Sequence, residues 1–163
     1  MFVSETYEVE DCYGVIRDSV ALWDYNNGVT TSFENGFVKV TNSGSEKWIG
    51  IASHSFDLPF SFKTTFKWNG SSDLRFSFLV SPNAYQNTSS TRSWVSSANL
   101  THNITDTDEH ELEIQCRDGY FYIYVDGELD TSVRLNTMSN HYVFMYAMNG
   151  RTYLFKNWRI KPL

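Results

Sequence analysis

The side chains with the clearest capacity for chemistry are two carboxylates two positions apart, Glu111 and Glu113, followed by an amide at Gln115. A retaining glycosidase uses two carboxyl groups about 5 Å apart, one as nucleophile and one as acid. Residues two apart on a strand share a face and lie about 6.6 Å apart at Cα, so the spacing permits this chemistry. Solvated carboxylates on an exposed strand face explain the same residues, and we favour that interpretation.

Other reactive side chains do not form a recognisable catalytic or metal-binding pattern. The four histidines, at positions 54, 102, 110 and 141, are not at ligand spacing and have no cysteine cluster beside them, which argues against zinc. No nucleophile elbow and no phosphate-binding glycine loop occurs. Cys12 and Cys116 fit one long-range disulfide or two buried thiols, and we favour the thiols. The sequence therefore predicts no catalytic residue and no bound metal.

The elements that position these residues are expected to be strands. No segment has apolar residues at helical spacing over three turns, whereas alternation with a period of two recurs in short runs separated by Gly, Asn, Asp and Ser. The clearest hairpin joins 110–116 to 120–125 through Asp118-Gly119, a dipeptide that tolerates positive φ. About ten to twelve short strands predict an all-β fold, a two-sheet antiparallel sandwich of the jelly-roll kind. Residues 1–163 are the length of one domain.

Strand parity predicts a binding surface on this hairpin. If Leu112 and Ile114 face the core, then alternate residues face outward, and these are Glu111, Glu113, Gln115, Tyr120, Tyr122 and Tyr124. Sugars suit such a face, because their C–H groups stack on aromatic rings and their hydroxyls need fixed donors and acceptors. An apolar stripe of alternate residues, Leu74, Phe76, Phe78 and Val80, leaves Arg75, Ser77 and Leu79 on the other, outward face of that strand. Arg75 and Trp48 are expected to join the binding surface. The 81–108 region, a functional loop or a short irregular strand, is expected to contribute to its rim.

The candidate ligand-binding residues are therefore Trp48, Arg75, Tyr85, Trp94, Glu113, Gln115, Tyr122 and Tyr124. The alternative is structural. Trp48 and Tyr146 would then fill the core between two sheets, and the outward tyrosines would be covered by a neighbouring domain or subunit.

Charge and the distribution of apolar residues argue against nucleic acid and membrane as partners. The formal net charge is -6 and no basic run occurs, which argues against nucleic acid, because phosphate binding needs clustered Lys and Arg. The first twenty residues are acidic, the wrong charge for a signal peptide, and no apolar stretch approaches the roughly 20 residues of a membrane span. We expect no membrane insertion, and if the protein is exported, this chain is an excised or mature piece.

Three segments resemble a known superfamily. The segment EHELEIQCRDGYFYIYVDGEL resembles the hairpin of concanavalin A-like lectin/glucanase domains, including laminin G-like modules. The C-terminal FKNWRIKPL is similar to the closing strand of the keto-disaccharide hydrolase-like branch, and FDLPFSFKTTFKW fits an apolar-Pro step into a core strand. The resemblance covers about half of the chain. It implies a concanavalin A-like sandwich, in a superfamily that contains lectins, carbohydrate-binding modules, adhesion modules, viral and phage attachment domains and some glycosidases.

The resemblance also bears on catalysis and on metal. Glucanases of the superfamily carry Glu, Asp and a further Glu along this strand, whereas here Gln115 is at the end and no Asp lies between, which implies a non-catalytic domain. Many members hold a structural calcium ion between the chain termini. Where their closing strand offers Asp, this chain has Lys156, a cation that would repel the ion. The remaining candidate oxygen ligands are Glu10, Asp11, Asp24 and Asp126.

We expect a non-catalytic, lectin-like carbohydrate-binding recognition module that is part of a larger extracellular, cell-surface or phage-tail protein. Its partner would be a glycan or glycosylated surface. We expect no cofactor, with a structural calcium ion as the open alternative, and a homo-oligomer or neighbouring domains as further partners. The first alternative is a structural or protein-interaction module of an adhesin or virion, with a role in adhesion or receptor binding. The second alternative is a glycoside hydrolase.

Overall fold

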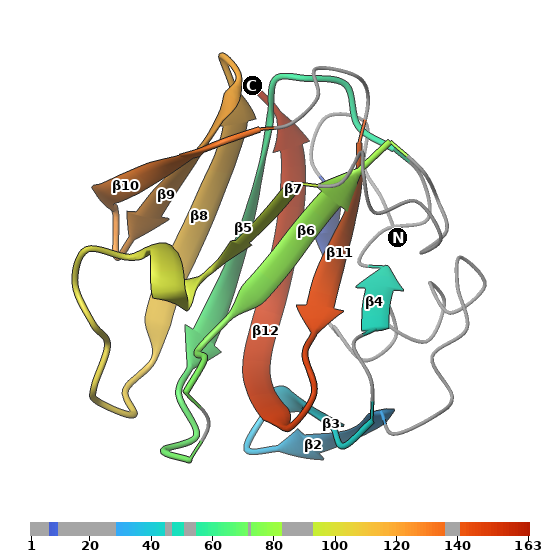
Figure 1. Ribbon diagram of the computed structural model, residues 1–163, viewed down its shortest axis with the longest axis vertical. Coiled ribbons are helices and arrows are strands. Elements are labelled where there is room, and N and C mark those ends of the chain that lie inside the picture. Colours follow the sequence, from blue (N-terminus) through green and yellow to red (C-terminus); the bar gives the residue numbers. More distant parts are fainter. Residues whose placement is uncertain are drawn as a thin grey trace.

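The computed structural model of the protein describes residues 7–9, 29–44, 47–50, 55–71, 73–82, 93–135 and 141–163. It confirms the predicted fold class, because its strands form two antiparallel sheets that pack face to face (Figure 1). Apart from one 3-10 turn, η3 (Ser97–Asn99), the regular elements of these residues are strands. None of the described helical segments has the length and apolar character needed to span a membrane.

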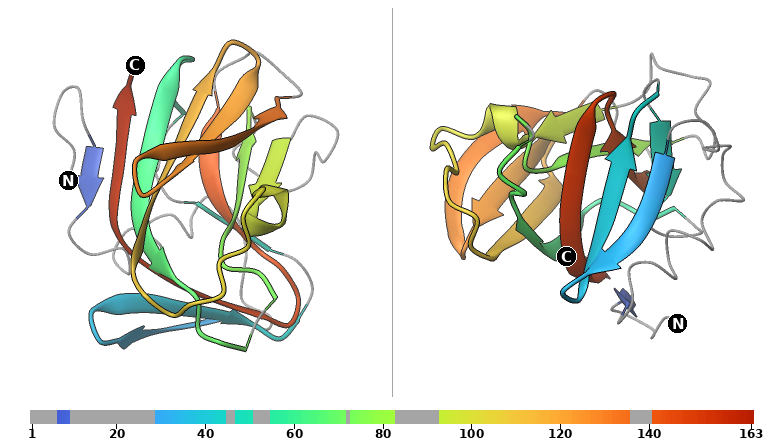
Figure 2. Two further views of the ribbon diagram at one scale, coloured as in Figure 1. Left: turned by 90° about the vertical axis from the view of Figure 1, so that its left-hand side faces the viewer. Right: turned by 90° about the horizontal axis from the view of Figure 1, so that it is seen from below.

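The larger sheet has eight strands in the order β10-β9-β8-β5-β12-β3-β2, with β1 also paired to β12. Its strands are β10 (Glu128–Arg134), β9 (Tyr120–Val125), β8 (His110–Arg117), β5 (Phe60–Lys67), β12 (Arg151–Pro162), β3 (Phe37–Asn42), β2 (Val29–Glu34) and β1 (Tyr7–Val9). The smaller sheet has four, in the order β4-β11-β6-β7. They are β4 (Lys47–Gly50), β11 (Tyr142–Ala147), β6 (Ser77–Ser81) and β7 (Ser93–Ser96). Figure 2 shows β2 and β3 at one end of the sandwich.

Two Asp-Gly dipeptides make tight turns, and the first of them lies where the sequence predicts it. Asp118 and Gly119 have φ of 54° and 80°, and Asp126 and Gly127 have φ of 53° and 86°. Only residues that tolerate the left-handed region suit both central positions of such a hairpin turn. These two turns fix the register of β8, β9 and β10, the three strands at one edge of the larger sheet.

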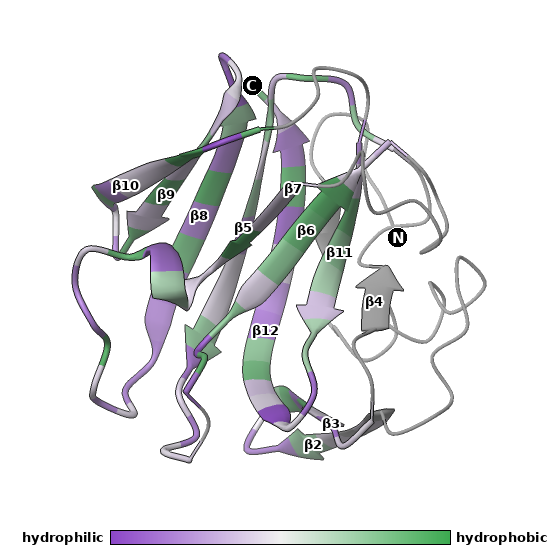
Figure 3. Cartoon of the chain, in the orientation of Figure 1, coloured by the Kyte–Doolittle hydropathy of each residue, from purple (hydrophilic) through white to green (hydrophobic). Residues whose placement is uncertain are grey.

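Alternation along β8 and β9 sends apolar side chains toward the smaller sheet and polar ones away from it. Leu112, Ile114 and Cys116 on β8 are fully buried, as are Phe121 and Ile123 on β9. The intervening residues of both strands are partly or fully exposed. Figure 3 shows the resulting bands of hydrophobic and hydrophilic residues along β8. The parity predicted for this hairpin is therefore confirmed.

Aromatic rings join the two layers in the core. Trp158 on β12 is fully buried and lies edge-on to Phe78 of β6, with 5.2 Å between ring centroids. Phe62 of β5 also meets Phe78 edge-on, at 5.6 Å. Burying large rings removes apolar surface from water, the main favourable term in folding. This cluster holds the larger sheet, and so the outward face of β8 and β9, against the smaller one.

One expectation about exposure needs correction. Leu79 was predicted to face outward on β6, but every residue of β6 is buried, including Leu79 at 0 % exposure. Alternation reports which side chains share a face, and here both faces of the strand are covered, so it does not report exposure. Tyr146 on β11 is buried, with its ring edge-on to Trp94 of the same sheet. Cys116 is a buried free thiol whose pKa burial raises, and Cys12 lies outside the described residues.

Candidate functional site

The outward side of β8 and β9 carries a compact set of aromatic and polar side chains. Cross-strand pairing places Glu113 opposite Tyr124, Gln115 opposite Tyr122, and Arg117 opposite Tyr120. Directly opposite residues on one sheet face have Cβ atoms about 4.5–5.5 Å apart, so each ring lies beside a polar group. We call this set the tyrosine face, and it comprises Glu113, Gln115, Arg117, Tyr120, Tyr122 and Tyr124.

A chain of hydrogen bonds orients the polar groups of the tyrosine face. The Gln115 amide nitrogen donates to Glu113 Oε2 at 3.2 Å, and Gln115 Oε1 accepts from Arg117 Nε at 2.8 Å. Arg117 also donates through Nη2 to the Tyr124 hydroxyl, at 3.3 Å. Each group is thus held by a neighbour on a rigid strand. The arrangement presents an ordered carboxylate, amide and guanidinium to solvent.

The rings of the tyrosine face are tied to the same arginine. The Arg117 guanidinium carbon lies 3.9 Å from the centroid of the Tyr122 ring, a cation–π contact. Tyr120 and Tyr122 lie 6.0 Å apart at their centroids, tilted by 52°. Tyr120, at 36 % exposure, is the most open of the three tyrosines. A ligand would therefore meet a combined surface of tyrosine rings and a guanidinium plane.

Sequence reasoning missed Arg117, although the signal was present. Arg117 follows Glu113 and Gln115 at the same two-residue spacing and so lies on the same face. The predicted strand ends at position 116, one residue short of Arg117, which is the last strand residue before the Asp118-Gly119 turn.

The two carboxylates of β8 lie in different polar surroundings. Glu111 lies 3.8 Å from Lys63 Nζ on the adjacent strand β5, and it accepts from Arg159 Nη2 on β12, one strand further along the sheet, at 3.5 Å. Glu113 instead accepts from the amide of Gln115. Both groups are thus arranged as hydrogen-bond acceptors.

Arg75 and Trp94 do not lie on the tyrosine face. Arg75, between β5 and β6, donates through Nε to the Ile104 carbonyl at 2.7 Å and stacks over Trp68 at 4.0 Å. Trp94 lies on β7 of the smaller sheet, where its Nε1 donates to Ser77 Oγ at 2.9 Å and its ring meets Tyr146 edge-on. Alternation within a strand does not reveal which sheet the strand joins, and this explains the error.

Two further predicted residues are only partly covered by the described structure. Trp48 belongs to β4, so its strand is in the smaller sheet and not beside the tyrosine face, contrary to the expectation that it would join that surface. Its side chain and all of Tyr85 lie outside the described residues. Of the eight predicted ligand-binding residues, the structure brings four together, namely Glu113, Gln115, Tyr122 and Tyr124.

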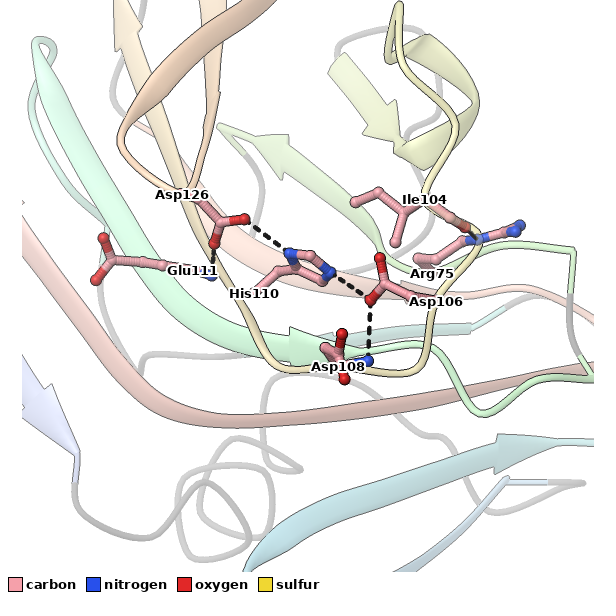
Figure 4. A network of polar contacts seen from close by, with 7 residues as sticks. All are labelled: Arg75, Ile104, Asp106, Asp108, His110, Glu111 and Asp126. Atoms are coloured by element: carbon pink, nitrogen blue, oxygen red, sulfur yellow. Dashed lines mark hydrogen bonds and ion pairs between the residues drawn. The ribbon is translucent and has the colours of Figure 1, made fainter.

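A histidine bridged by two carboxylates secures the end of β8 where the strand begins (Figure 4). His110 Nδ1 lies 2.7 Å from Asp126 Oδ2, and its Nε2 lies 2.8 Å from Asp106 Oδ1. Asp126 also accepts from the backbone N–H of Glu111 at 2.9 Å, which ties the β9–β10 turn to β8. Burial lowers the His110 pKa, but the hydrogen bonds to Asp126 and Asp106 outweigh it, so the pKa is raised. The network positions the hairpin that carries the tyrosine face.

Asp126 was one of the candidate calcium ligands, and its carboxylate is engaged by His110 and the Glu111 amide. Glu10, Asp11 and Asp24 lie outside the described residues. Among the residues that the structure does describe, no group of three or more His, Cys, Asp or Glu side chains is arranged to hold a metal ion.

A polar hollow of about 290 Å³ adjoins the tyrosine face at the β9–β10 turn, lined by His102, Val125, Asp126, Glu128, Leu129 and Asp130. Leu129, 55 % exposed, lies opposite Tyr124 in the strand register. Asp130 accepts from the backbone N–H of Thr101 at 2.7 Å and contacts His102 Nδ1 at 2.9 Å. Burial raises the Asp130 pKa, but these hydrogen bonds outweigh it, so the pKa is lowered. The hollow thus combines fixed acceptors with an exposed apolar side chain.

Comparison with known proteins gives likeness in structure alone. No protein-family model and none of the curated proteins match the sequence. Among solved structures, the carbohydrate-binding module CBM66 from Bacillus subtilis matches with a TM-score of 0.57 at 13% identity, over 85% of this chain and 98% of that one. A candidate glycosyl hydrolase from Parabacteroides distasonis matches with a TM-score of 0.60 at 12% identity, over 86% and 93% of the two chains.

The chain has a concanavalin A-like jelly-roll fold. An endo-β-galactosidase from Clostridium perfringens shares it, with a TM-score of 0.55 and 8% identity over 81% of this chain and 53% of that one. The fold predicted from the hairpin and the closing strand is therefore confirmed. Because the similar structures include a binding module and enzymes, the jelly roll alone does not decide between binding and catalysis.

Proposed function

We propose that this jelly roll is a non-catalytic, lectin-like carbohydrate-binding module, and that the tyrosine face is its binding site. The observation that carries the proposal is the hydrogen-bonded chain from Glu113 through Gln115 to Arg117, set beside Tyr122 and Tyr124. Sugar hydroxyls require donors and acceptors at fixed positions, and sugar C–H faces require aromatic surface. The tyrosine face supplies both on neighbouring strands.

Rigidity supports the same proposal. Binding to a flexible surface costs free energy for each side chain that becomes ordered, whereas groups already held by their neighbours cost less. Gln115 is fixed on both sides, by Glu113 and by Arg117. The β8–β9 hairpin itself is secured by the Asp118-Gly119 turn and by His110. The polar groups are thus arranged before a ligand arrives.

Binding without catalysis is favoured by the surroundings of the carboxylates. A retaining mechanism needs one carboxyl group protonated as an acid while its partner is ionised. Glu111 is held in ion pairs with Lys63 on β5 and Arg159 on β12. The outward position that follows Glu113 along β8 is the amide of Gln115. Hydrolysis of a bound glycan that is abolished in Glu113→Gln would contradict the non-catalytic proposal.

The wider setting that we propose is a larger extracellular, cell-surface or phage-tail protein. A single shallow face binds a sugar weakly, and several copies or neighbouring domains multiply such contacts into useful avidity. The proteins of similar structure include a carbohydrate-binding module and an endo-β-galactosidase. This supports a carbohydrate ligand.

Screening on a glycan array, followed by titration of the glycans retained, tests the proposal. Tyr122→Ala is expected to weaken binding about 2- to 10-fold, because an aromatic contact contributes about 0.5–1.5 kcal/mol. Trp94→Ala, an aromatic truncation in the other sheet, is the matched control and is expected to leave the affinity unchanged. Absence of glycan binding would overturn the proposed function. Loss of binding in Trp94→Ala but not in Tyr122→Ala would overturn the assigned site.

A protein-interaction module is the second candidate, and it is favoured by exposed apolar side chains. Phe33 on β2 and Leu129 on β10 are each 55 % exposed, at opposite edges of the larger sheet. Exposed apolar patches often mark protein interfaces. A stable oligomer in size-exclusion chromatography that dissociates in Leu129→Ser and Phe33→Ser would favour this role over glycan binding.

A further inference from the structure

We propose that the glycan bound by the tyrosine face is acidic, and that its carboxylate or sulfate group is bound between Arg117 and Arg134, which flank Tyr120. This inference rests on the proposed function and names the class of sugar. It is carried by the arrangement of three residues on three neighbouring strands at one end of the face.

The strand register aligns the three residues in one row. Arg117 of β8 lies opposite Tyr120 of β9, and Tyr120 lies opposite Arg134 of β10. Directly opposite residues share a sheet face at about 4.5–5.5 Å between Cβ atoms, so the two arginines stand on either side of Tyr120 in the sheet. The Arg117 guanidinium group extends over the adjacent Tyr122 ring. Tyr120 and Arg134 are exposed, and the Arg117 side chain is 32 % exposed. The row is accessible to a large ligand.

Both guanidinium groups retain donors for a ligand. Arginine has five N–H donors. Arg117 directs one to Gln115, one to Asp118 and one to Tyr124, which leaves one on each terminal nitrogen. Within the part of the chain that the structure describes, no hydrogen bond or ion pair occupies Arg134. Guanidinium groups bind carboxylate and sulfate-like oxyanions through paired N–H donors.

The local charge contrasts with that of the whole chain. The protein has a formal net charge of -6, yet this end of the face carries Arg117, Arg134 and, one row along, Lys161 opposite Ser61. The acidic side chains near it are Asp118, which pairs with Arg117, and Glu113, which accepts from Gln115. Three cations are few for a nucleic-acid backbone but suffice for the single charge of an acidic sugar.

Matched pairs of immobilised glycans test this inference. Each pair differs only in its acidic group, for example sialylated against desialylated, sulfated against unsulfated, and polygalacturonate against its methyl ester. We expect the acidic member to bind at least tenfold more tightly, with the preference falling as NaCl rises. Arg134→Gln is expected to remove most of the preference. Lys39→Gln, the same charge change on β3 at the opposite side of the sheet, is expected to leave it intact.

The outcomes separate this inference from the proposed function. Equal binding of the acidic and neutral members, weakened in both by Tyr122→Ala, would overturn the acidic ligand and leave the carbohydrate-binding role in place. Binding of neither member of any pair would overturn both. Binding of single-stranded DNA as tightly as the acidic glycans would also contradict the inference, because it would indicate a site for polyanions in general.

Discussion

Arg117 organises the tyrosine face at the scale of single residues, because one guanidinium group contacts the Gln115 amide, the Tyr124 hydroxyl and the Tyr122 ring. A planar group with five donors makes these contacts together, and the compact ammonium of lysine does not. A partly exposed arginine contributes little to folding through such pairs. The residue is therefore more important for the shape of the face than for stability.

Replacing Arg117 by Lys separates these two effects. The charge is retained, but the contacts to Gln115 and Tyr124 are lost, so we expect glycan affinity to fall about tenfold while Tm changes by only about 2 °C. Titration and thermal unfolding of the same preparation measure both. A fall in Tm with unchanged affinity would assign Arg117 a structural role instead.

The bridged His110 makes the free energy of unfolding fall as pH rises. The His110 pKa is raised in the folded state, so its stabilisation is complete below the unfolded value of 6.5 and is lost as pH rises through the folded pKa. Hydrogen bonding to His110 lowers the pKa of Asp106, whose contribution is lost only as pH falls below about 4.

We therefore expect the difference in unfolding free energy between wild type and His110→Gln to shrink as pH rises from 6 to 9. Denaturant unfolding at several pH values measures it. A difference that stays constant with pH would show that the histidine is not charged in the folded protein.

Buried His141 has the opposite effect, because it makes the free energy of unfolding fall as pH falls. Burial lowers its pKa to about 4, so the folded state keeps the His141 ring neutral. Stability is therefore lost as pH falls from about 6.5 towards 4. A shift of this size corresponds to a loss on the order of 3 kcal/mol by pH 4. His141→Leu should flatten this limb of the pH profile of unfolding free energy. An acid limb of the same steepness in both proteins would contradict the account.

At the scale of elements, β12 is the strand that joins the parts of the larger sheet. Its first half pairs with β3 and its second half with β1, while β5 accompanies it on the other side. The register shifts between Lys156 and Arg159, where Asn157 has a φ of 60°. Asparagine tolerates this left-handed conformation better than most residues, and β-branched residues tolerate it poorly.

We expect two substitutions of Asn157 at this bulge to differ in their effect on the unfolding free energy. Asn157→Val should lower the unfolding free energy by about 1–2 kcal/mol, because valine is strained at this φ. Asn157→Gly should be close to neutral, because glycine adopts the conformation without strain. Urea unfolding of both variants measures the difference. Equal destabilisation would indicate that the Asn157 side chain, and not its backbone, is what matters.

Elements were predicted from the sequence more reliably than their partners. Alternation placed β8 and β9, and Asp118-Gly119 placed the turn between them, because both signals are local. Sheet membership depends on long-range pairing that no local pattern encodes. Arg75 and Trp48 were accordingly placed on the wrong surface, whereas Glu113, Gln115, Tyr122 and Tyr124 were correctly brought together, since one hairpin carries all four.

At the scale of the whole molecule, the two sheets of the jelly roll have different roles. The smaller sheet supplies strands such as β6 and most of β11 that are buried on both faces, and the larger sheet presents its outward face with polar and aromatic groups. The fold is shared with binding modules and with enzymes. The function that we propose therefore depends on the side chains of the tyrosine face and not on the architecture.

The most direct test of this account is to map the glycan-contacting residues in solution. Titration of the ¹⁵N-labelled protein with a glycan retained on the array, followed by amide chemical shifts, locates the site without any mutation. We predict that the largest changes occur at Glu113, Gln115, Arg117, Tyr120 and Tyr122 on β8 and β9. Changes confined to β6 and β7 around Trp94, or no changes in the presence of glycan, would contradict it.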